Sequence, residues 1–242
     1  YADLAAASGL FDHIDADGRP KGLVQTLRLF ARLRAARYDR VYDLQTSSLS
    51  RWLFYAFLPR PPQWSGISRG ASHRQRRADR DALHNLDRMA DQLHVAGIGP
   101  AYGPGEAPPP DLSWAASVAG CEPEGLLARF GLRRPFAILA PGASAVKPEK
   151  VWPIHAYAAL AQALESAGLQ IAVAGGAAES PLFSIISARA PGAVDLTGWT
   201  SLVELASLGA CVRLCVGNDS GPTHLLAYAG APGLMLMSRV SD

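Results

Sequence analysis

The sequence predicts an α/β fold in two domains, residues 1–110 and 111–242. Short apolar segments alternate with amphipathic ones, which favours parallel strands connected by helices. The apolar segments of the second half show no polar alternation, as is typical of strands covered on both faces. A stretch rich in glycine and proline, residues 99–110, separates the halves, because proline fixes φ and glycine disfavours a helix. The alternative interpretation of this stretch is a long surface loop within one domain.

In the first half, the helical spacing of apolar residues predicts helices at 23–36, 47–57 and 85–96. Pro59 ends the second of these, because proline cannot continue a helix. A short strand is predicted at 40–45, between the first two helices.

In the second half the alternation is more regular. Continuous apolar runs predict strands, and amphipathic segments predict the helices between them. The strands are expected at 136–140, 170–174, 212–216 and 233–237, and the helices at 155–167, 180–190, 201–208 and 223–229.

Composition excludes several classes of protein. Hydrophobic residues make up 49% and charged residues 18%, so the chain can bury a core and is not disordered. The net charge of +2 gives no argument for nucleic-acid binding. No apolar run approaches the roughly 20 residues that cross a bilayer. The odd number of cysteines, with no C-x-x-C pair, predicts reduced thiols in a cytoplasmic protein and no metal site.

Glycine and small polar residues follow three of the predicted strands, where ligands bind in open parallel sheets. They stand at 141–144, 175–179 and 219–224. In the third segment Pro222 suits the first turn of a helix, so Ser220 and Gly221 would offer backbone amides to an anion. His224 would project one turn further on. The segment predicts a phosphate site, although it matches neither the dinucleotide fingerprint nor the P-loop.

Two further charged residues stand near the same strand ends. Lys150 follows the first segment and could reach a diphosphate as a mobile point charge. Glu179 follows the second and could accept hydrogen bonds from ribose hydroxyls. The alternatives are a solvated surface lysine, a charge at a helix start, and, for His224, a buried core histidine.

Taken together these motifs resemble glycosyltransferase family nine, whose best-known members are the ADP-heptose:lipopolysaccharide heptosyltransferases. The resemblance covers residues 136–237 in order, and it extends less specifically into the first half. It is carried by Pro-Gly-Ala-Ser with Lys-Val-Trp-Pro at 141–153, Ala-Gly-Gly-Ala-Ala-Glu at 174–179, Asp-Leu-Thr-Gly-Trp-Thr-Ser-Leu at 195–202, Gly-Asn-Asp-Ser-Gly-Pro-Thr-His at 217–224, and two segments at 38–45 and 84–88.

The resemblance implies two Rossmann-like domains facing across a cleft, the GT-B arrangement, with the sugar donor on the second domain. It implies inverting transfer without a metal or other cofactor, from a nucleoside-diphosphate sugar such as ADP-heptose to a lipopolysaccharide core-type acceptor. By position, Ser144 and Lys150 would contact the diphosphate, Glu179 the ribose and Thr200 the base. The sugar–diphosphate portion would be bound by Asp219, Ser220, Gly221 and His224.

The sequence departs from the family at the catalytic base. Family members carry this carboxylate in a Gly-Asp turn near their amino terminus, and no such turn precedes residue 99 here. We therefore expect the first domain to be incomplete at its start and the base to lie in a preceding segment. Asp43, at a strand end, is only a stand-in for it.

On the acceptor side, the resemblance points to residues that follow the strand at 40–45, namely Gln45, Ser47 and Arg51. Their alternatives are helix capping and a surface arginine. The basic stretch 69–80 is interpreted either as a solvated loop or as a contact with phosphates of a lipid-linked or oligosaccharide acceptor, or with an anionic membrane surface.

The expected protein is thus a cytoplasmic glycosyltransferase, a monomer that contacts the inner face of the membrane peripherally and binds no nucleic acid. The rival is a catalytically inactive homologue that binds a nucleotide sugar as a binding or scaffold protein. An oxidoreductase of the NAD type is disfavoured, because no glycine fingerprint follows any strand.

Overall fold

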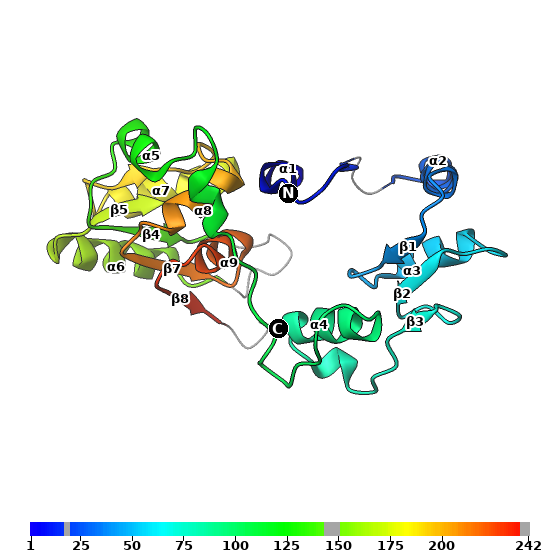
Figure 1. Ribbon diagram of the computed structural model, residues 1–242. Coiled ribbons are helices and arrows are strands. Elements are labelled where there is room, and N and C mark those ends of the chain that lie inside the picture. Colours follow the sequence, from blue (N-terminus) through cyan, green and yellow to red (C-terminus); the bar gives the residue numbers. More distant parts are fainter. Residues whose placement is uncertain (17–19, 143–150, 238–242) are drawn as a thin grey trace. The chain divides into compact units, whose positions relative to one another are not determined.

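The computed structural model describes residues 1–16, 20–142 and 151–237 and has the expected α/β fold (Figure 1). It divides into two compact units, and each is described by itself. Unit 1 comprises Tyr1–Asp15 and Pro110–Asp242, and unit 2 comprises Ala16–Pro109. The first fifteen residues are thus grouped with the second half of the chain, which differs from the expected division at residue 110. The reason is that α1 (Ala2–Ser8) packs Leu4 and Ala7 against the core of unit 1.

Unit 1 is built on a parallel sheet of five strands in the order β6-β5-β4-β7-β8. The strands are β4 (Phe136–Ala140), β5 (Gln170–Val173), β6 (Val194–Asp195), β7 (Leu214–Asn218) and β8 (Gly233–Leu236). After β4 the chain adds β5 and β6 on one side, and then returns to add β7 and β8 on the other. The strand order therefore reverses between β4 and β7, which is where such sheets bind ligands.

Helices cover both faces of this sheet (Figure 1). On one face lie η2 (Ser113–Ser117), α5 (Pro123–Phe130), α8 (Leu202–Gly209) and α9 (Gly221–Tyr228), and on the other α6 (Ile154–Ser166) and α7 (Ser180–Ser187). Phe136 and Ile138 of β4 pack into the first layer, whereas Ala137 and Leu139 pack into the second. All four are fully buried, which explains the continuous apolar run.

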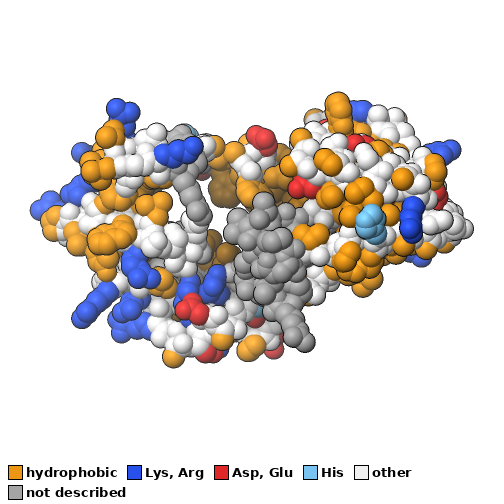
Figure 2. All heavy atoms as spheres, turned by 180° about the vertical axis from the view of Figure 1, so that it is seen from behind, with side chains coloured by type: hydrophobic (Ala, Val, Ile, Leu, Met, Phe, Trp, Pro, Cys, Tyr) orange, Lys and Arg blue, Asp and Glu red, His pale blue; other side chains and the backbone are white. Residues whose placement is uncertain are grey.

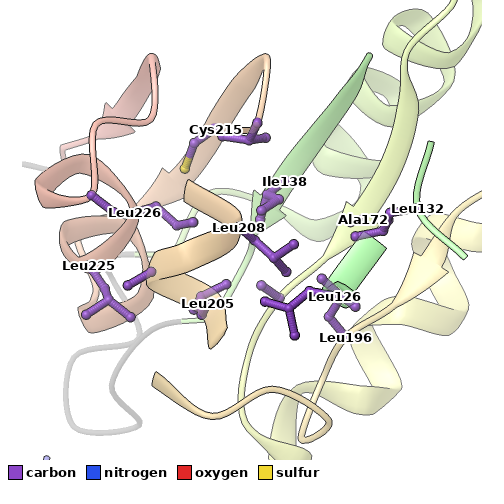
Figure 3. Packing of buried hydrophobic residues seen from close by; sticks show 14 of the residues in the cluster. Leu126, Leu132, Ile138, Ala172, Leu196, Leu205, Leu208, Cys215, Leu225 and Leu226 are labelled. Carbon is purple, nitrogen blue, oxygen red and sulfur yellow. The ribbon is translucent and has the colours of Figure 1, made fainter. Parts of the chain in front are cut away.

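The first of these layers is a core of aliphatic side chains. Figure 3 shows Ile138 of the sheet with Leu205 and Leu208 of α8 and Leu226 of α9. Local sequence fixes the start of α8, because Ser201 and Glu204 form a capping box. The Ser201 Oγ accepts from the Glu204 amide at 3.2 Å, and the Glu204 carboxylate accepts from the Ser201 amide at 2.7 Å.

Unit 2 contains a smaller parallel sheet in the order β1-β2-β3. Phe54, Phe57 and Trp64 form its core, with the rings of Phe54 and Trp64 edge to face at 5.4 Å. Its elements are α2 (Leu23–Ala35), β1 (Arg40–Tyr42), α3 (Ser48–Ala56), β2 (Gln63–Gly66), β3 (His73–Arg74), η1 (Arg80–Ala82) and α4 (Asn85–Val95).

The stretch at 99–110 is irregular, as expected, but its middle is anchored to unit 2. The buried carboxylate of Asp87 in α4 accepts from the amide of Gly105 at 2.8 Å and from that of Ala107 at 3.4 Å. On the other side, the Leu112 amide donates to the carbonyl of Tyr228 in unit 1 at 3.0 Å. Residues 108–111 connect these two anchors.

The sequence did not predict β2, β3 and β6. The β2 segment Gln-Trp-Ser-Gly has one large apolar residue, and β3 and β6 have two residues each, too few to show a period. The three cysteines are free thiols. Cys215 is buried, and that burial raises its pKa to about 11. Within the described residues, no helix is long and apolar enough to span a bilayer, and no group of three or more potential metal ligands occurs.

Candidate active site

A cavity of about 500 Å³ lies in unit 1 at the carboxyl ends of β4, β5 and β7. Ala140 and Gly142 line it after β4, and residues 174–176 with Glu179 line it after β5. Residues 219–222 and His224 line it after β7, and Tyr1 contributes from the start of the chain. The cavity therefore sits beside the reversal in strand order.

The structure brings together five of the eight residues that the sequence singled out on the donor side. These residues line the cavity just described; they are Glu179, Asp219, Ser220, Gly221 and His224. Thr200 is not among the lining residues; it follows Trp199 in the loop before α8. Ser144 and Lys150 lie outside the described residues.

Glu179 lies directly over glycine backbone at the ends of β4 and β5. A Cβ atom on Gly142 would fall 2.7 Å from the Glu179 Cγ, and one on Gly175 would fall 2.9 Å from the Glu179 Cβ. Neither distance is sterically allowed, so glycine is required at both positions for this side chain to reach across the strand ends. η4 (Ala177–Glu179) places the half-buried carboxylate at the cavity wall.

Asn218 fixes the end of β7 by two hydrogen bonds. Its amide nitrogen donates to the Pro141 carbonyl at 2.7 Å, and its side-chain oxygen accepts from the Trp152 amide at 2.9 Å. The residue is fully buried. It therefore ties β7 to both sides of the connection between β4 and α6, a role that sequence reasoning missed. Its position before Asp219, at the end of an apolar strand, was the available signal.

The start of α9 presents backbone amides at the cavity. Ser220 is its N-cap residue, but no side-chain capping bond to a backbone amide is formed, and the Ser220 hydroxyl pairs with that of Thr223 at 3.2 Å. First-turn amides have no acceptor within a helix. Together with the positive end of the helix dipole, they favour an anionic ligand such as a phosphate.

His224 and Asp219 form a pair at the same wall, with 2.9 Å between Nε2 and a carboxylate oxygen. The Asp219 side chain is 12% exposed and that of His224 is 42% exposed, so the histidine is the more accessible member. The imidazole is also stacked on Tyr228, with 28° between the ring planes. These contacts fix the orientation of the ring, and His224 is not a residue of the apolar core.

The acceptor-side residues lie in unit 2, after β1. Ser47 caps α3, with its Oγ accepting from the Ser50 amide at 3.2 Å, so the capping interpretation holds for this residue. Gln45 and Arg51 are exposed. Asp43 is buried, and one of its carboxylate oxygens accepts from the Thr46 amide at 2.8 Å. The carboxylate is therefore engaged within the turn that follows β1.

A family model described as glycosyltransferase family 9 (heptosyltransferase) matches residues 26–237. The chain belongs to glycosyltransferase family 9. This confirms the resemblance that the strand-end motifs carried. The matched range includes the strand-end segments 174–179 and 219–224, whose residues line the cavity.

Individual relatives agree with this family 9 assignment. The chain is 34% identical over 113 residues to lipooligosaccharide heptosyltransferase 2 of Haemophilus influenzae, which covers 45% of the chain and 32% of the relative. Among solved structures it is similar to a family 9 glycosyltransferase of Veillonella parvula, with a TM-score of 0.68 and 22% sequence identity. The match covers 89% of this chain and 63% of that one. For the E. coli ADP-heptose LPS heptosyltransferase II the TM-score is 0.65, with 24% sequence identity. That match covers 87% of this chain and 66% of the E. coli chain.

The structural similarities, at this level of identity, establish the fold. They confirm the expected GT-B fold class. The family 9 chain spans about a third of the length of the curated relative and less than two thirds of each of these two solved structures.

Proposed function

We propose that the protein is an inverting, metal-independent glycosyltransferase that moves heptose, or a related sugar, from a nucleoside diphosphate to a lipopolysaccharide core-type acceptor. The donor we propose is ADP-heptose. The observation that carries this proposal is the cavity at the reversal in strand order, into which α9 directs its amino-terminal turn. Membership of family 9 supports the same reaction class.

On the donor side, the first turn of α9 and the His224–Asp219 pair would bind the sugar–diphosphate portion, with Ser220 and Gly221 supplying amides. Glu179 would accept hydrogen bonds from the ribose hydroxyls. Thr200, in the loop beside Gly198, would border the base. Ser144 and Lys150, outside the described residues, would contact the diphosphate.

In the reaction, the acceptor hydroxyl attacks the anomeric carbon opposite the nucleotide, and the bond between that carbon and the phosphate oxygen breaks. The hydroxyl proton passes to a carboxylate base. Negative charge grows on the departing diphosphate. The amides at the start of α9 and the Lys150 ammonium group would stabilise this negative charge. We expect this stabilisation to be the main contribution of unit 1 to catalysis.

The donor site can be tested by titrating ADP into the protein in a calorimeter. We expect Asp219→Ala and Lys150→Ala each to weaken ADP binding about tenfold or more. Lys150→Ala removes a positive charge, and Asp219→Ala removes the carboxylate that orients His224 at the cavity wall. Lys21→Ala, which removes one of the other lysines from an exposed position in unit 2, is the matched control and should leave the affinity unchanged. Wild-type affinity in both site variants would refute the site assignment.

Charge is divided unequally between the units. Residues 16–109 contain 15 Lys and Arg against 8 Asp and Glu, a net +7, whereas the whole chain carries only +2. Figure 2 shows these basic side chains gathered over unit 2. Such a surface suits the phosphates of a lipid-linked or oligosaccharide acceptor at the cytoplasmic face of the membrane. We propose that unit 2, with Gln45, Ser47 and Arg51, binds the acceptor, and that the enzyme works as a monomer in peripheral contact with that surface.

The basic stretch 69–80 provides a test of this acceptor proposal. Arg69 and Arg76 are exposed, so removing both charges should not affect folding. We expect Arg69→Gln with Arg76→Gln to raise the acceptor KM about threefold to tenfold at low salt, and the difference to shrink at high salt through screening. Arg189→Gln, an exposed arginine in unit 1, is the control. An acceptor KM that is equally insensitive to the unit 2 and unit 1 substitutions would contradict the proposal.

A further inference from the structure

The turn between β1 and α3 contains a strained residue. Thr46 has φ of 49°, in the left-handed region that β-branched residues strongly disfavour. It stands between Gln45 and Ser47, at the carboxyl end of β1, where ligands of parallel sheets bind. A residue of this type keeps such a conformation only when its surroundings hold it there.

Two side chains hold Thr46, one from its own turn. The Asp43 carboxylate accepts from the Thr46 amide at 2.8 Å. Asp43 is itself fixed in the sheet, since its amide donates to the Ser65 carbonyl at 2.9 Å and its carbonyl accepts from the Gln92 side chain at 2.9 Å. The carboxylate is therefore a rigid support rather than a mobile one.

The second support comes from the basic stretch. The Arg80 guanidinium donates to the Thr46 hydroxyl, and its Nε donates to the Gln75 side-chain oxygen at 2.7 Å. The Arg80 side chain is only 12% exposed, unlike the exposed Arg69 and Arg76. The remaining guanidinium nitrogen of Arg80, Nη1, forms an ion pair with the Asp81 carboxylate, with 2.6 Å between Nη1 and Oδ1. Asp81 itself is exposed.

Gln75 anchors this arginine to the rest of unit 2. It is buried, its backbone amide donates to the Gly66 carbonyl at 2.9 Å, and its side chain donates to Asp91 of α4 at 2.5 Å and to the Arg88 carbonyl at 3.0 Å. A continuous set of hydrogen bonds thus runs from α4 through Gln75 and Arg80 to the Thr46 hydroxyl, across the carboxyl edge of the sheet.

We infer that Arg80 is a positioning residue for the acceptor. Together with Asp43 it holds Thr46 in the left-handed conformation, and so fixes where Gln45 and the α3 cap Ser47 stand. Arg80 acts through Thr46 and does not itself contact substrate. This inference rests on the proposed function, because that proposal makes the turn part of the acceptor site.

Glycine offers a direct test, because it adopts positive φ without strain. Steady-state kinetics of the complete protein with ADP-heptose and a lipopolysaccharide core acceptor would compare Arg80→Gln, Thr46→Gly and the double variant. We expect Arg80→Gln to raise the acceptor KM about tenfold and to leave the donor KM within about twofold. In the Thr46→Gly background, which has no hydroxyl for Arg80 to bind, Arg80→Gln should change the acceptor KM by no more than about twofold.

Hydrogen exchange of the segment 43–51 gives a readout that does not depend on activity. It should be faster in Arg80→Gln than in wild type, whereas Arg80→Gln in the Thr46→Gly background should change it little. Arg28→Gln, an exposed arginine of α2, is the charge control and should change neither quantity.

Three results would overturn the inference. An active wild type whose acceptor KM is unchanged by Arg80→Gln would show that the residue is only structural. An acceptor KM that Arg80→Gln raises equally in the wild-type and Thr46→Gly backgrounds would indicate direct contact between Arg80 and substrate. A wild type that transfers no sugar would remove the proposed function and this inference with it, which the first two results would not do.

Discussion

Replacing Gly217 with alanine is expected to lower the free energy of unfolding by about 4 kcal/mol, the largest effect of any single substitution considered for this chain. A Cβ atom on Gly217 would lie 2.2 Å from the Thr223 hydroxyl, 2.9 Å from the Ala140 Cβ and 3.1 Å from the Ala140 carbonyl. β4 and α9 would both have to move, and both line the cavity. Urea denaturation would measure the loss, and ADP affinity should fall with it.

Gly125 supplies the matched control for this substitution. It lies in the helix α5, and a Cβ there would meet no atom within 4 Å. Gly125→Ala should therefore stabilise the protein by about 0.5–1 kcal/mol, the ordinary helix preference for alanine. If Gly217→Ala were as stable as wild type, the close packing of β7 against β4 and α9 would be wrong.

Replacing Asn218 with alanine is expected to cost about 3 kcal/mol in unfolding free energy. The substitution removes two hydrogen bonds and leaves the Pro141 carbonyl and the Trp152 amide without the partner that now satisfies them. Because these two groups flank the segment that contains Ser144 and Lys150, ADP affinity should also fall, by about tenfold. Urea denaturation and calorimetric titration would measure the two effects.

The affinity change can be separated from the loss of stability by the choice of ligand. Adenosine lacks the diphosphate, so its affinity should change much less than that of ADP in Asn218→Ala. Asn85→Ala, the exposed asparagine at the start of α4, is the control and should fall within about 0.5 kcal/mol of wild type. An equal loss for both ligands would mean that Asn218 supports the unit as a whole and has no specific effect at the phosphates.

The second half of the chain could be predicted closely because its main strands are continuous apolar runs, several of which end in glycine and small polar residues. The runs at 136–140 and 170–174 became β4 and β5, and the glycines after them line one cavity. The positions of Asp219, Ser220, Gly221 and His224 followed from one rule, that strand ends of a parallel sheet meet at one edge. Placing these four residues at one edge required no further argument from hydrophobic periodicity.

The first half was harder to predict, because its short strands have too few residues to show a pattern. β2 is recognisable only through its pairing with β1, and β3 only through its pairing with β2. The packing of α1 on unit 1 and the bonds of Arg80 likewise depend on residues far apart in the chain. In the sequence, Arg80 is one of several arginines in the stretch 69–80. Its neighbours along the chain do not distinguish it from the arginines that are exposed.

The sequence by itself determined the fold class, the family and the order of the chemistry-bearing segments, because these depend on local patterns and on motifs read along the chain. The tertiary structure alone decided which side chains hold distant segments together by hydrogen bonds, such as Asn218 at the end of β7 and Arg80 at Thr46. The physical reason is that a hydrogen bond is set by distance and burial, and residues 66 or 34 positions apart become neighbours only when the strands have paired.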